Sequence, residues 1–257
     1  MQLSQGYSIL LALLFGLAAG LVGSFALMRR MLLAGDVISH LALPGLGVAF
    51  LFKVNPLLGG AATLFLGTLL IWKLQKKTGL ATEAMTGVVF AAALALGAVV
   101  TPKEDLVDAL FGGFPMLSLA GLLFGVMAVA VVIVFIVRSK DRLALSLFST
   151  DLATVSGVNV NRLNLYFLFV FSLTVLIGLQ FMGTLLSSAL IIMPAAVGRQ
   201  LTNKFSHFLI VSSTVSVFSV AVGFLANSVV KSPTVSPVIV IVSALLFALS
   251  LVIRRKQ

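Results

Sequence analysis

Charged residues are scarce in this sequence of 257 residues, and cysteine is absent. Only 9% of the residues are charged and 60% are hydrophobic, which gives a mean hydropathy of +1.21. In soluble domains roughly a quarter of the residues are charged, so a protein of this composition cannot cover its surface with polar groups. The composition excludes a soluble enzyme and indicates a membrane protein.

Two absences narrow the chemistry further. Without cysteine, neither a disulfide nor a thiolate metal site is possible. The sequence also contains no Gly-Lys dipeptide, and hence no P-loop of the form G-x-x-x-x-G-K-[ST]. If this protein takes part in ATP-driven transport, another chain must hydrolyse the ATP.

Apolar runs divide the chain into nine segments separated by short polar connections. A spanning helix takes ~20 residues, so nine of them use about 180 residues. We therefore predict an all-α polytopic membrane protein in which residues 1–257 form one transmembrane domain. It stays open whether region 163–198 crosses the membrane twice or only once, which would give eight spans in total. A turn at Gly178 to Gly183 favours two short helices. The predicted spans are residues 9–28, 36–52, 56–73, 83–101, 116–137, 163–179, 182–198, 207–229 and 236–253.

The basic residues behind the net charge of +10 are unevenly placed along the chain, and this placement predicts the orientation of the protein in the membrane. Basic residues accumulate on the cytoplasmic side of membrane proteins, which places the N-terminus outside and the C-terminus in the cytoplasm. Because the basic residues form small clusters without interleaved aromatic residues, we expect no nucleic-acid partner. Only three basic residues are predicted on the outer side of the membrane, namely Lys53, Lys103 and Lys231. The fourteen predicted cytoplasmic residues are Arg29, Arg30, Lys73, Lys76, Lys77, Arg138, Lys140, Arg142, Arg162, Arg199, Lys204, Arg254, Arg255 and Lys256.

Two of the polar connections are expected to form helices of their own. On the predicted outer side, residues 102–115 hold three of the seven acidic residues, and we expect a short interfacial or re-entrant helix there. On the predicted cytoplasmic side, residues 138–162 form the longest polar stretch. Its apolar residues are spaced for a short amphipathic helix. These residues are Leu143, Leu145, Leu147, Leu152, Ala153 and Val155.

Ionisable groups within a predicted span are candidates for function, because each costs on the order of several kcal/mol at the bilayer centre. Asp36, His40 and Glu83 meet this condition. The i, i+4 spacing of Asp36 and His40 places a carboxylate and an imidazole on one side of a helix, which is half of a site for Zn²⁺, Mn²⁺ or Fe²⁺. The spacing also fits a structural role, with Asp36 as a helix cap and His40 bonded to a neighbouring helix. Glu83 fits a first-turn carboxylate.

Two prolines lie within predicted spans and bear on a transport pathway. Pro44 leaves the carbonyl of His40 without its helical partner, and Pro194 does the same for Leu190. A freed carbonyl is tolerated in a membrane only where it lines a cavity or packs on protein. We therefore expect kinks at both prolines, and pore or purely structural roles remain open for Pro194.

Short motifs, taken in order along the chain, resemble those of the membrane permease subunit of bacterial ATP-binding-cassette importers for zinc, manganese and iron. The resemblance covers essentially the whole chain, and its most specific part is the stretch from Val175 to Arg199. Thr150 stands where a proline is common in the family, and the final outer loop lacks a glycine. The other matching motifs are Gly23-Ser24-Phe25, Arg29-Arg30-Met31, Gly35-Asp36, Ser39-His40, Val54-Asn55-Pro56, Gly87 with the 88–97 run, Leu110-Phe111-Gly112, Asp151-Leu152-Ala153 and Gly157-Val158.

The resemblance implies a homodimeric permease in the bacterial cytoplasmic membrane, with ATPase subunits on its cytoplasmic side and a metal-loaded solute-binding protein outside. Asp36 and His40 match the family's metal-coordinating pair. Asp151, Ala153 and Gly157 match the segment that docks into the ATPase, within a coupling region of about 141–160. The metal is cargo, so the resemblance implies no permanently bound cofactor and no enzymatic activity of this chain. Zinc is the first expectation, with manganese or iron as alternatives.

Two other classes of function remain open from the residues alone. An ion-coupled secondary transporter would use Asp36 and His40 as a proton relay and need no ATPase. A structural membrane subunit would carry no ion of its own. Flux through variants of Asp36 and His40, and the effect of changes at Ala153 or Gly157, distinguish these classes from the importer.

Overall fold

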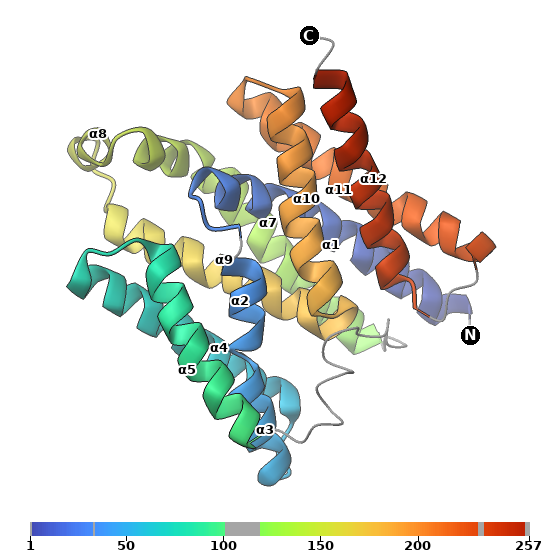
Figure 1. The fold of residues 1–257 in the computed structure, drawn as a ribbon, viewed down its shortest axis with the longest axis horizontal. Helices are drawn as coiled ribbons and strands as arrows, with labels where there is room; N and C mark the ends of the chain where they lie inside the picture. Colours follow the sequence, from blue (N-terminus) through green and yellow to red (C-terminus); the bar gives the residue numbers. More distant parts are fainter. Residues whose placement is uncertain (1, 33, 101–118, 231–233, 255–257) are drawn as a thin grey trace.

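The computed structural model describes residues 2–32, 34–100, 119–230 and 234–254, which form helices joined by short turns (Figure 1). Among these described residues, six helices are long and apolar enough to span a membrane, namely α1, α4, α7, α9, α11 and α12. Three shorter apolar segments, Ala34–Ala49, Thr82–Gly97 and Leu185–Leu201, coincide with the remaining predicted spans. The all-α polytopic fold is confirmed, and crossing by the three shorter segments stays a prediction. The helices are α1 (Gln2–Met28), α2 (Ala34–His40), α3 (Leu43–Leu51), α4 (Pro56–Thr78), α5 (Thr82–Val100), α7 (Leu119–Phe148), α8 (Thr150–Val155), α9 (Val160–Met182), α10 (Thr184–Leu201), α11 (Phe205–Val230) and α12 (Ser236–Arg254).

The helix ends fall into two groups in space. The connections α1–α2, α4–α5, α7–α9 and α10–α11 lie toward the left and top of Figure 1, as does the end of α12. The N-terminus and the connections α3–α4 and α9–α10 lie toward the right and bottom. Which of these ends share a membrane face stays a prediction, as does the placement of the two termini. The side that faces the cytoplasm stays a prediction based on charge.

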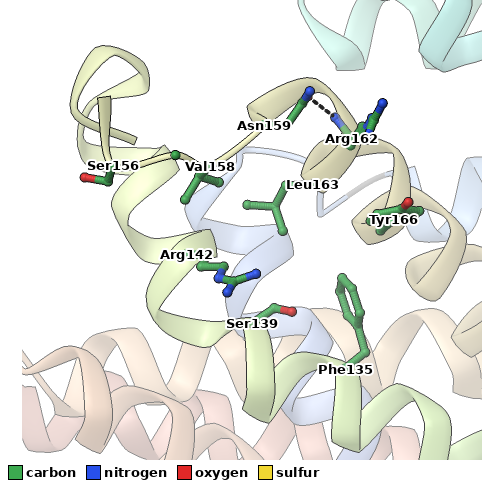
Figure 2. Close-up of a pocket in the computed structure, with 10 residues that line it drawn as sticks. Phe135, Ser139, Arg142, Ser156, Val158, Asn159, Arg162, Leu163 and Tyr166 are labelled. Carbon is green, nitrogen blue, oxygen red and sulfur yellow. Dashed lines mark hydrogen bonds between the residues drawn. The ribbon is translucent and has the colours of Figure 1, made fainter. Parts of the chain in front are cut away.

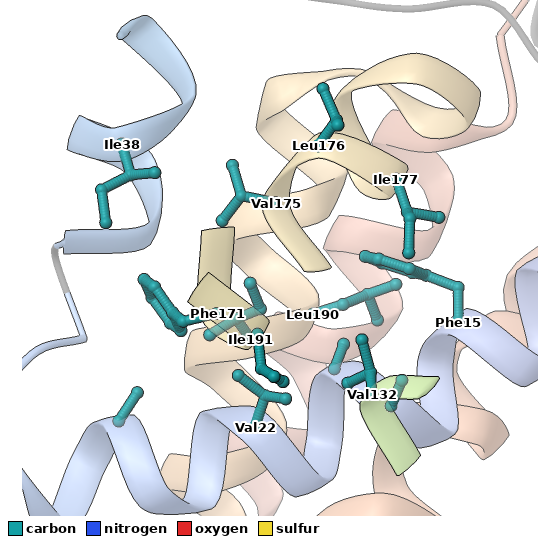
Figure 3. Close-up of a cluster of buried hydrophobic side chains, with 14 of the residues drawn as sticks. Phe15, Val22, Ile38, Val132, Phe171, Val175, Leu176, Ile177, Leu190 and Ile191 are labelled. Atoms are coloured by element: carbon teal, nitrogen blue, oxygen red, sulfur yellow. The ribbon is translucent and has the colours of Figure 1, made fainter. Parts of the chain in front are cut away.

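The core is built around α1 and α9. In each of these helices 67% of the most apolar window is buried, compared with 22% in α4 and α12, so α4 and α12 are peripheral. Figure 3 shows Phe15 of α1 beside Ile177 of α9 and Leu190 of α10, and Val22 of α1 beside Ile191 of α10. Ile38 of α2 joins this cluster from the far side, so the core anchors the short helix that holds Asp36 and His40.

One predicted helix end was wrong, one predicted interruption is stronger than expected, and one predicted turn was right. The expected span 36–52 is not one helix but α2 and α3, which are separated at Leu41 and Ala42. The expected span 116–137 continues as α7 to Phe148, because the polar residues after Val137 do not interrupt the helical hydrogen bonds. The turn expected at Gly178 to Gly183 occurs at Gly183, whose positive φ of 85° favours glycine.

Candidate functional site

Asp36 and His40 lie on the solvent-accessible side of α2. Gly35, Ile38 and Ser39 are buried against the core, whereas Asp36 is exposed and His40 is half-buried. The helix contacts α5, α9 and α10. The buried face thus fixes the orientation of α2 and leaves the carboxylate free to meet an ion or a second molecule.

The sequence ends α2 abruptly at His40. Leu41 and Ala42 donate to the carbonyls of Ile38 and Ser39 at 3.0 and 3.2 Å, which are the shorter-range bonds of a tightened helix end. Helix α3 begins at Leu43, and Pro44 follows in its first turn, where a missing N–H is tolerated. The kink expected at Pro44 is therefore a full break, and it lies directly after the His40 imidazole.

Neighbouring side chains hold the two candidate ligands in different ways. The His40 ring lies 5.7 Å from the Phe90 ring of α5, measured between centroids, at an angle of 55°. The Ser39 hydroxyl donates to the carbonyl of Asp36 at 2.5 Å, which stiffens the single turn between Asp36 and His40. Within the described residues, no group of three or more His, Cys, Asp or Glu side chains lies close enough to hold a metal ion. One described chain supplies at most two ligands here.

Helix α3 is held close to α4 by two glycines. A Cβ on Gly45 would clash with the carbonyl oxygen of Gly59 and with the Thr63 hydroxyl, and a Cβ on Gly59 would clash with the Gly45 carbonyl. Small residues permit this backbone approach between helices in a membrane. This close approach of the two backbones fixes the half-helix that follows the break.

The predicted coupling segment folds as the short helix α8, but its apolar face differs from the expectation. Leu143, Leu145 and Leu147 belong to the end of α7 and not to a separate amphipathic helix. Within α8 only Ala153 is buried. The other apolar side chains, Leu152 and Val155, are 61% and 88% exposed and Phe148 just before the helix is 79% exposed, so they are available to a partner.

Both ends of α8 are capped by the local sequence. The Ser149 hydroxyl accepts from the N–H of Leu152 at 3.2 Å. At the other end the N–H groups of Gly157 and Val158 donate to the carbonyls of Thr154 and Ala153 at 3.0 and 2.9 Å, which is a Schellman motif. Gly157 supplies the left-handed residue that this motif requires, with φ +78°. Gly157 therefore shapes the link between α8 and α9, while the Asp151 carboxylate is exposed at the first turn.

The other candidate residues from the sequence do not lie beside Asp36 and His40 in the described part of the structure. Pro194 is buried inside α10, which runs unbroken from Thr184 to Leu201, so the helix continues through the proline. Glu83 is exposed in the first turn of α5, where an acidic side chain complements the helix dipole. The acidic residues of the outer loop, Glu104, Asp105 and Asp108, lie outside the described residues.

The sequence interpretation missed a polar cluster around Arg29, because it counted this residue only as an orientation charge. Arg29 donates to Asn164 Oδ1 at 2.5 Å, and the Asn164 amide donates to Gln75 at 3.1 Å. This joins the end of α1 to α9 and α4. Burial lowers the pKa of Arg29, which lies just after α1, to about 10. The Arg-Arg pair in an otherwise apolar stretch was the only available signal.

Residues 6–254, nearly the whole chain, match the ABC 3 transport family. The chain belongs to this family. The manganese transport system membrane protein MntC of Listeria monocytogenes is 28% identical over 246 residues, covering 94% of this chain and 88% of that protein. The high-affinity zinc uptake system membrane protein ZnuB of Haemophilus influenzae is 28% identical over 255 residues, covering 95% and 97%.

A solved structure shows the same fold. It is described as PsaBC from Streptococcus pneumoniae in complex with Fab, and it matches with a TM-score of 0.80 at 24% identity, covering 96% of this chain and 90% of that chain. Family membership makes this chain a transport subunit rather than an enzyme. It is a multi-pass protein of the bacterial inner membrane.

Proposed function

We propose that this chain is the permease of an ATP-driven importer that moves a divalent transition metal into the cell, with zinc as the first candidate cargo. The observation that carries the proposal is the family match over residues 6–254, together with a carboxylate and an imidazole on one turn at a helix break. Relatives named for zinc and for manganese are equally similar at 28% identity, so manganese is the second candidate and iron the third.

Asp36 and His40 are the proposed metal ligands. A carboxylate oxygen and a neutral imidazole nitrogen suit zinc and also manganese or iron. Because the described part of one chain offers only two ligands, we propose that two copies of the chain meet at α2 and supply four. The exposure of Asp36 in the single chain supports this arrangement.

The exposed side chains of α8 are the proposed contact with an ATPase subunit. Leu152 and Val155 present apolar surface on a short helix that is capped at both ends, as a helix that docks into a groove does. The sequence has no P-loop, so hydrolysis belongs to that partner. A solute-binding protein would deliver the metal on the opposite side of the membrane.

Radiolabelled metal uptake into vesicles tests the proposal. The vesicles contain this chain with its candidate ATPase and binding protein, and zinc and manganese are compared at equal concentrations. We expect ATP-dependent uptake that is lost in Asp36→Ala and in His40→Ala. Glu83→Ala and His207→Ala are the matched controls, because both remove an exposed side chain of similar chemistry outside α2 and should keep uptake.

Each outcome has a distinct reading. Uptake that ignores ATP but follows a proton gradient would overturn the importer in favour of a secondary transporter. Uptake that persists in both α2 variants would refute the proposed ligands while keeping the importer. Manganese uptake without zinc uptake would change the cargo only. Size-exclusion profiles in detergent show whether each variant is folded.

A further inference from the structure

We propose that the cavity between α7 and α9, on the predicted cytoplasmic side, binds the phosphate of an anionic phospholipid headgroup. The cavity has a volume of about 340 Å³. Arg142 of α7 and Arg162 of α9 line it together with Tyr166, and Ser139 and Phe135 of α7 complete the wall (Figure 2). This site is separate from the ligand pair in α2 and does not depend on the transported ion.

The charges of the cavity are of one sign. Arg142 and Arg162 are both exposed, and within the described part of the chain neither guanidinium has an ion-pair or hydrogen-bond partner. None of the described residues that line the cavity is acidic, and the carboxylates of Asp141 and Asp151 are exposed outside it. Arginine side chains bind phosphate through paired N–H groups. The cavity therefore presents two side chains of the kind that binds phosphate.

The N-terminus of α9 adds to this positive potential. Helix α9 has 23 residues and begins at the edge of the cavity, where the Asn159 side chain accepts from the N–H of Arg162 at 3.0 Å (Figure 2). The positive end of a long helix favours a nearby anion. Two independent sources of positive potential thus act on the same cavity.

The position of the cavity along the helices matches the level of lipid headgroups. In α7 the apolar run ends at Val137, and the basic residues Arg138, Lys140 and Arg142 follow. In α9 the apolar run begins at Leu163, directly after Arg162. Basic pockets between spanning helices at this boundary are typical sites for anionic headgroups.

The aromatic residues of the cavity distinguish a lipid from a free anion. Phe135 lies two turns before Arg142 in α7, and Tyr166 lies one turn after Arg162 in α9, so both lie on the bilayer side of the arginines. The Tyr166 side chain is 53% exposed, and tyrosine is enriched at the membrane interface. A cavity with a basic end and an aromatic end suits a phosphate that is attached to glycerol and acyl chains.

Occupancy of this cavity would also act on the link between α8 and α9. Ser156, Gly157 and Val158 form part of its wall. A bound headgroup would therefore hold the end of α7, this link and the start of α9 together. Anionic lipid should stabilise this chain in a way that neutral lipid does not.

The test is thermal unfolding of the delipidated chain in detergent, titrated with phosphatidylglycerol. Phosphatidylcholine and inorganic phosphate at matched concentrations are the comparison ligands. We expect phosphatidylglycerol alone to raise Tm. In the double variant Arg142→Gln, Arg162→Gln the lipid concentration at half-effect should rise by about tenfold or more, because two charge-assisted contacts are lost.

The matched control is Arg199→Gln, Lys204→Gln, which removes the same charge from two exposed residues of the α10–α11 corner, outside this cavity. Its half-effect concentration should rise by less than about threefold, the general effect of lower surface charge. An equal rise in both double variants would overturn the proposal. An unchanged value in the Arg142, Arg162 variant would do the same.

The comparison ligands decide the source of the phosphate. If inorganic phosphate stabilises the chain as much as phosphatidylglycerol does, the cavity is a free-anion site. If phosphatidylcholine stabilises it equally, the charge of the headgroup is not recognised. Either result overturns the proposed lipid site. If the double variant does not fold, the single variants Arg142→Gln and Arg162→Gln decide, each with an expected rise of about threefold or more. No rise in either would overturn the proposal.

Discussion

The guanidinium of Arg29 lies over the ring of Phe167, with 4.5 Å between Cζ and the ring centroid. The same guanidinium donates to Asn164, and its Nε atom is buried without a hydrogen-bond partner within the described residues. A buried cation is therefore stabilised here by one amide oxygen and one aromatic face. This arrangement joins the end of α1 to the first turns of α9.

Removing the Arg29 side chain should destabilise the protein. We expect Arg29→Ala to lower the free energy of unfolding by about 2–3 kcal/mol, since a hydrogen bond to a charged group and a cation–π contact are both lost. Equilibrium unfolding in mixed micelles, followed by circular dichroism, measures the change. Arg138→Ala, at an exposed position of α7, is the control and should stay within about 0.5 kcal/mol of the wild type. Equal stability of the two variants would contradict this prediction.

The lowered pKa of Arg29 predicts the pH range in which this residue makes the free energy of unfolding depend on pH. Burial lowers this pKa from its ordinary value to about 10 in the folded protein, so above that pH the unfolded chain binds more protons than the folded one. The contribution of Arg29 to the free energy of unfolding should therefore rise with pH in that alkaline range and should be constant at lower pH. Unfolding of the wild type and Arg29→Met between about pH 6 and 9 should differ by a constant amount. A difference that changes with pH in this range would be inconsistent with a charged Arg29.

The contact between α3 and α4 should be intolerant of any side chain at Gly45. We expect Gly45→Ala to cost about 2–3 kcal/mol or to prevent folding, because the new Cβ clashes with the backbone of α4. Gly87→Ala in α5 is a matched control, since a Cβ there meets no atom within 4 Å. This control should be neutral or up to about 1 kcal/mol more stable. Unfolding in mixed micelles compares the two, and equal effects would refute a close α3–α4 contact.

A buried hydroxyl pair links α4 and α9. Thr68 Oγ1 and Ser172 Oγ are 2.6 Å apart. A double-mutant cycle with Thr68→Val and Ser172→Ala should give a coupling energy of about 0.6–1.7 kcal/mol, as found for hydrogen bonds between helices in membranes. The exposed Thr214 donates to the Ile210 carbonyl of its own helix α11 and, among the described residues, bonds to no other helix, so Thr214→Val should be close to neutral. A coupling energy near zero would show that this pair does not contribute.

The cap at Gly157 should control the stability of α8. Gly157→Ala places a Cβ on a residue with φ +78°, which costs about 1 kcal/mol or more although no atom obstructs it. Amide hydrogen exchange at Val158 should accelerate by about fivefold, whereas Gly157→Asn should have a smaller effect because asparagine tolerates this backbone conformation. Exchange that is as slow in the alanine variant as in the wild type would contradict the role of the Schellman motif.

Several features could be predicted from the sequence because their causes are local. Hydrophobic runs long enough for a bilayer predicted all nine apolar segments, and a proline in the second of them predicted an interruption beside His40. The turn at Gly183 followed from the length of an uncharged region too long for one helix. The i, i+4 spacing of Asp36 and His40 is likewise a property of one turn, although their role as metal ligands stays a prediction.

Only the tertiary structure shows which side chains from distant parts of the sequence contact one another. Arg29 and Asn164 are 135 residues apart, and no periodicity relates them. The pairing of Arg142 with Arg162 in one cavity and the contact of Gly45 with Gly59 depend on how α7 packs on α9 and how α3 packs on α4. The end of α7 was misjudged for a related reason, because Leu143 is fully buried by packing that the local sequence does not show. Hydrophobicity along the chain determines where helices form in a membrane, whereas contacts between distant side chains determine which of their polar groups form a site.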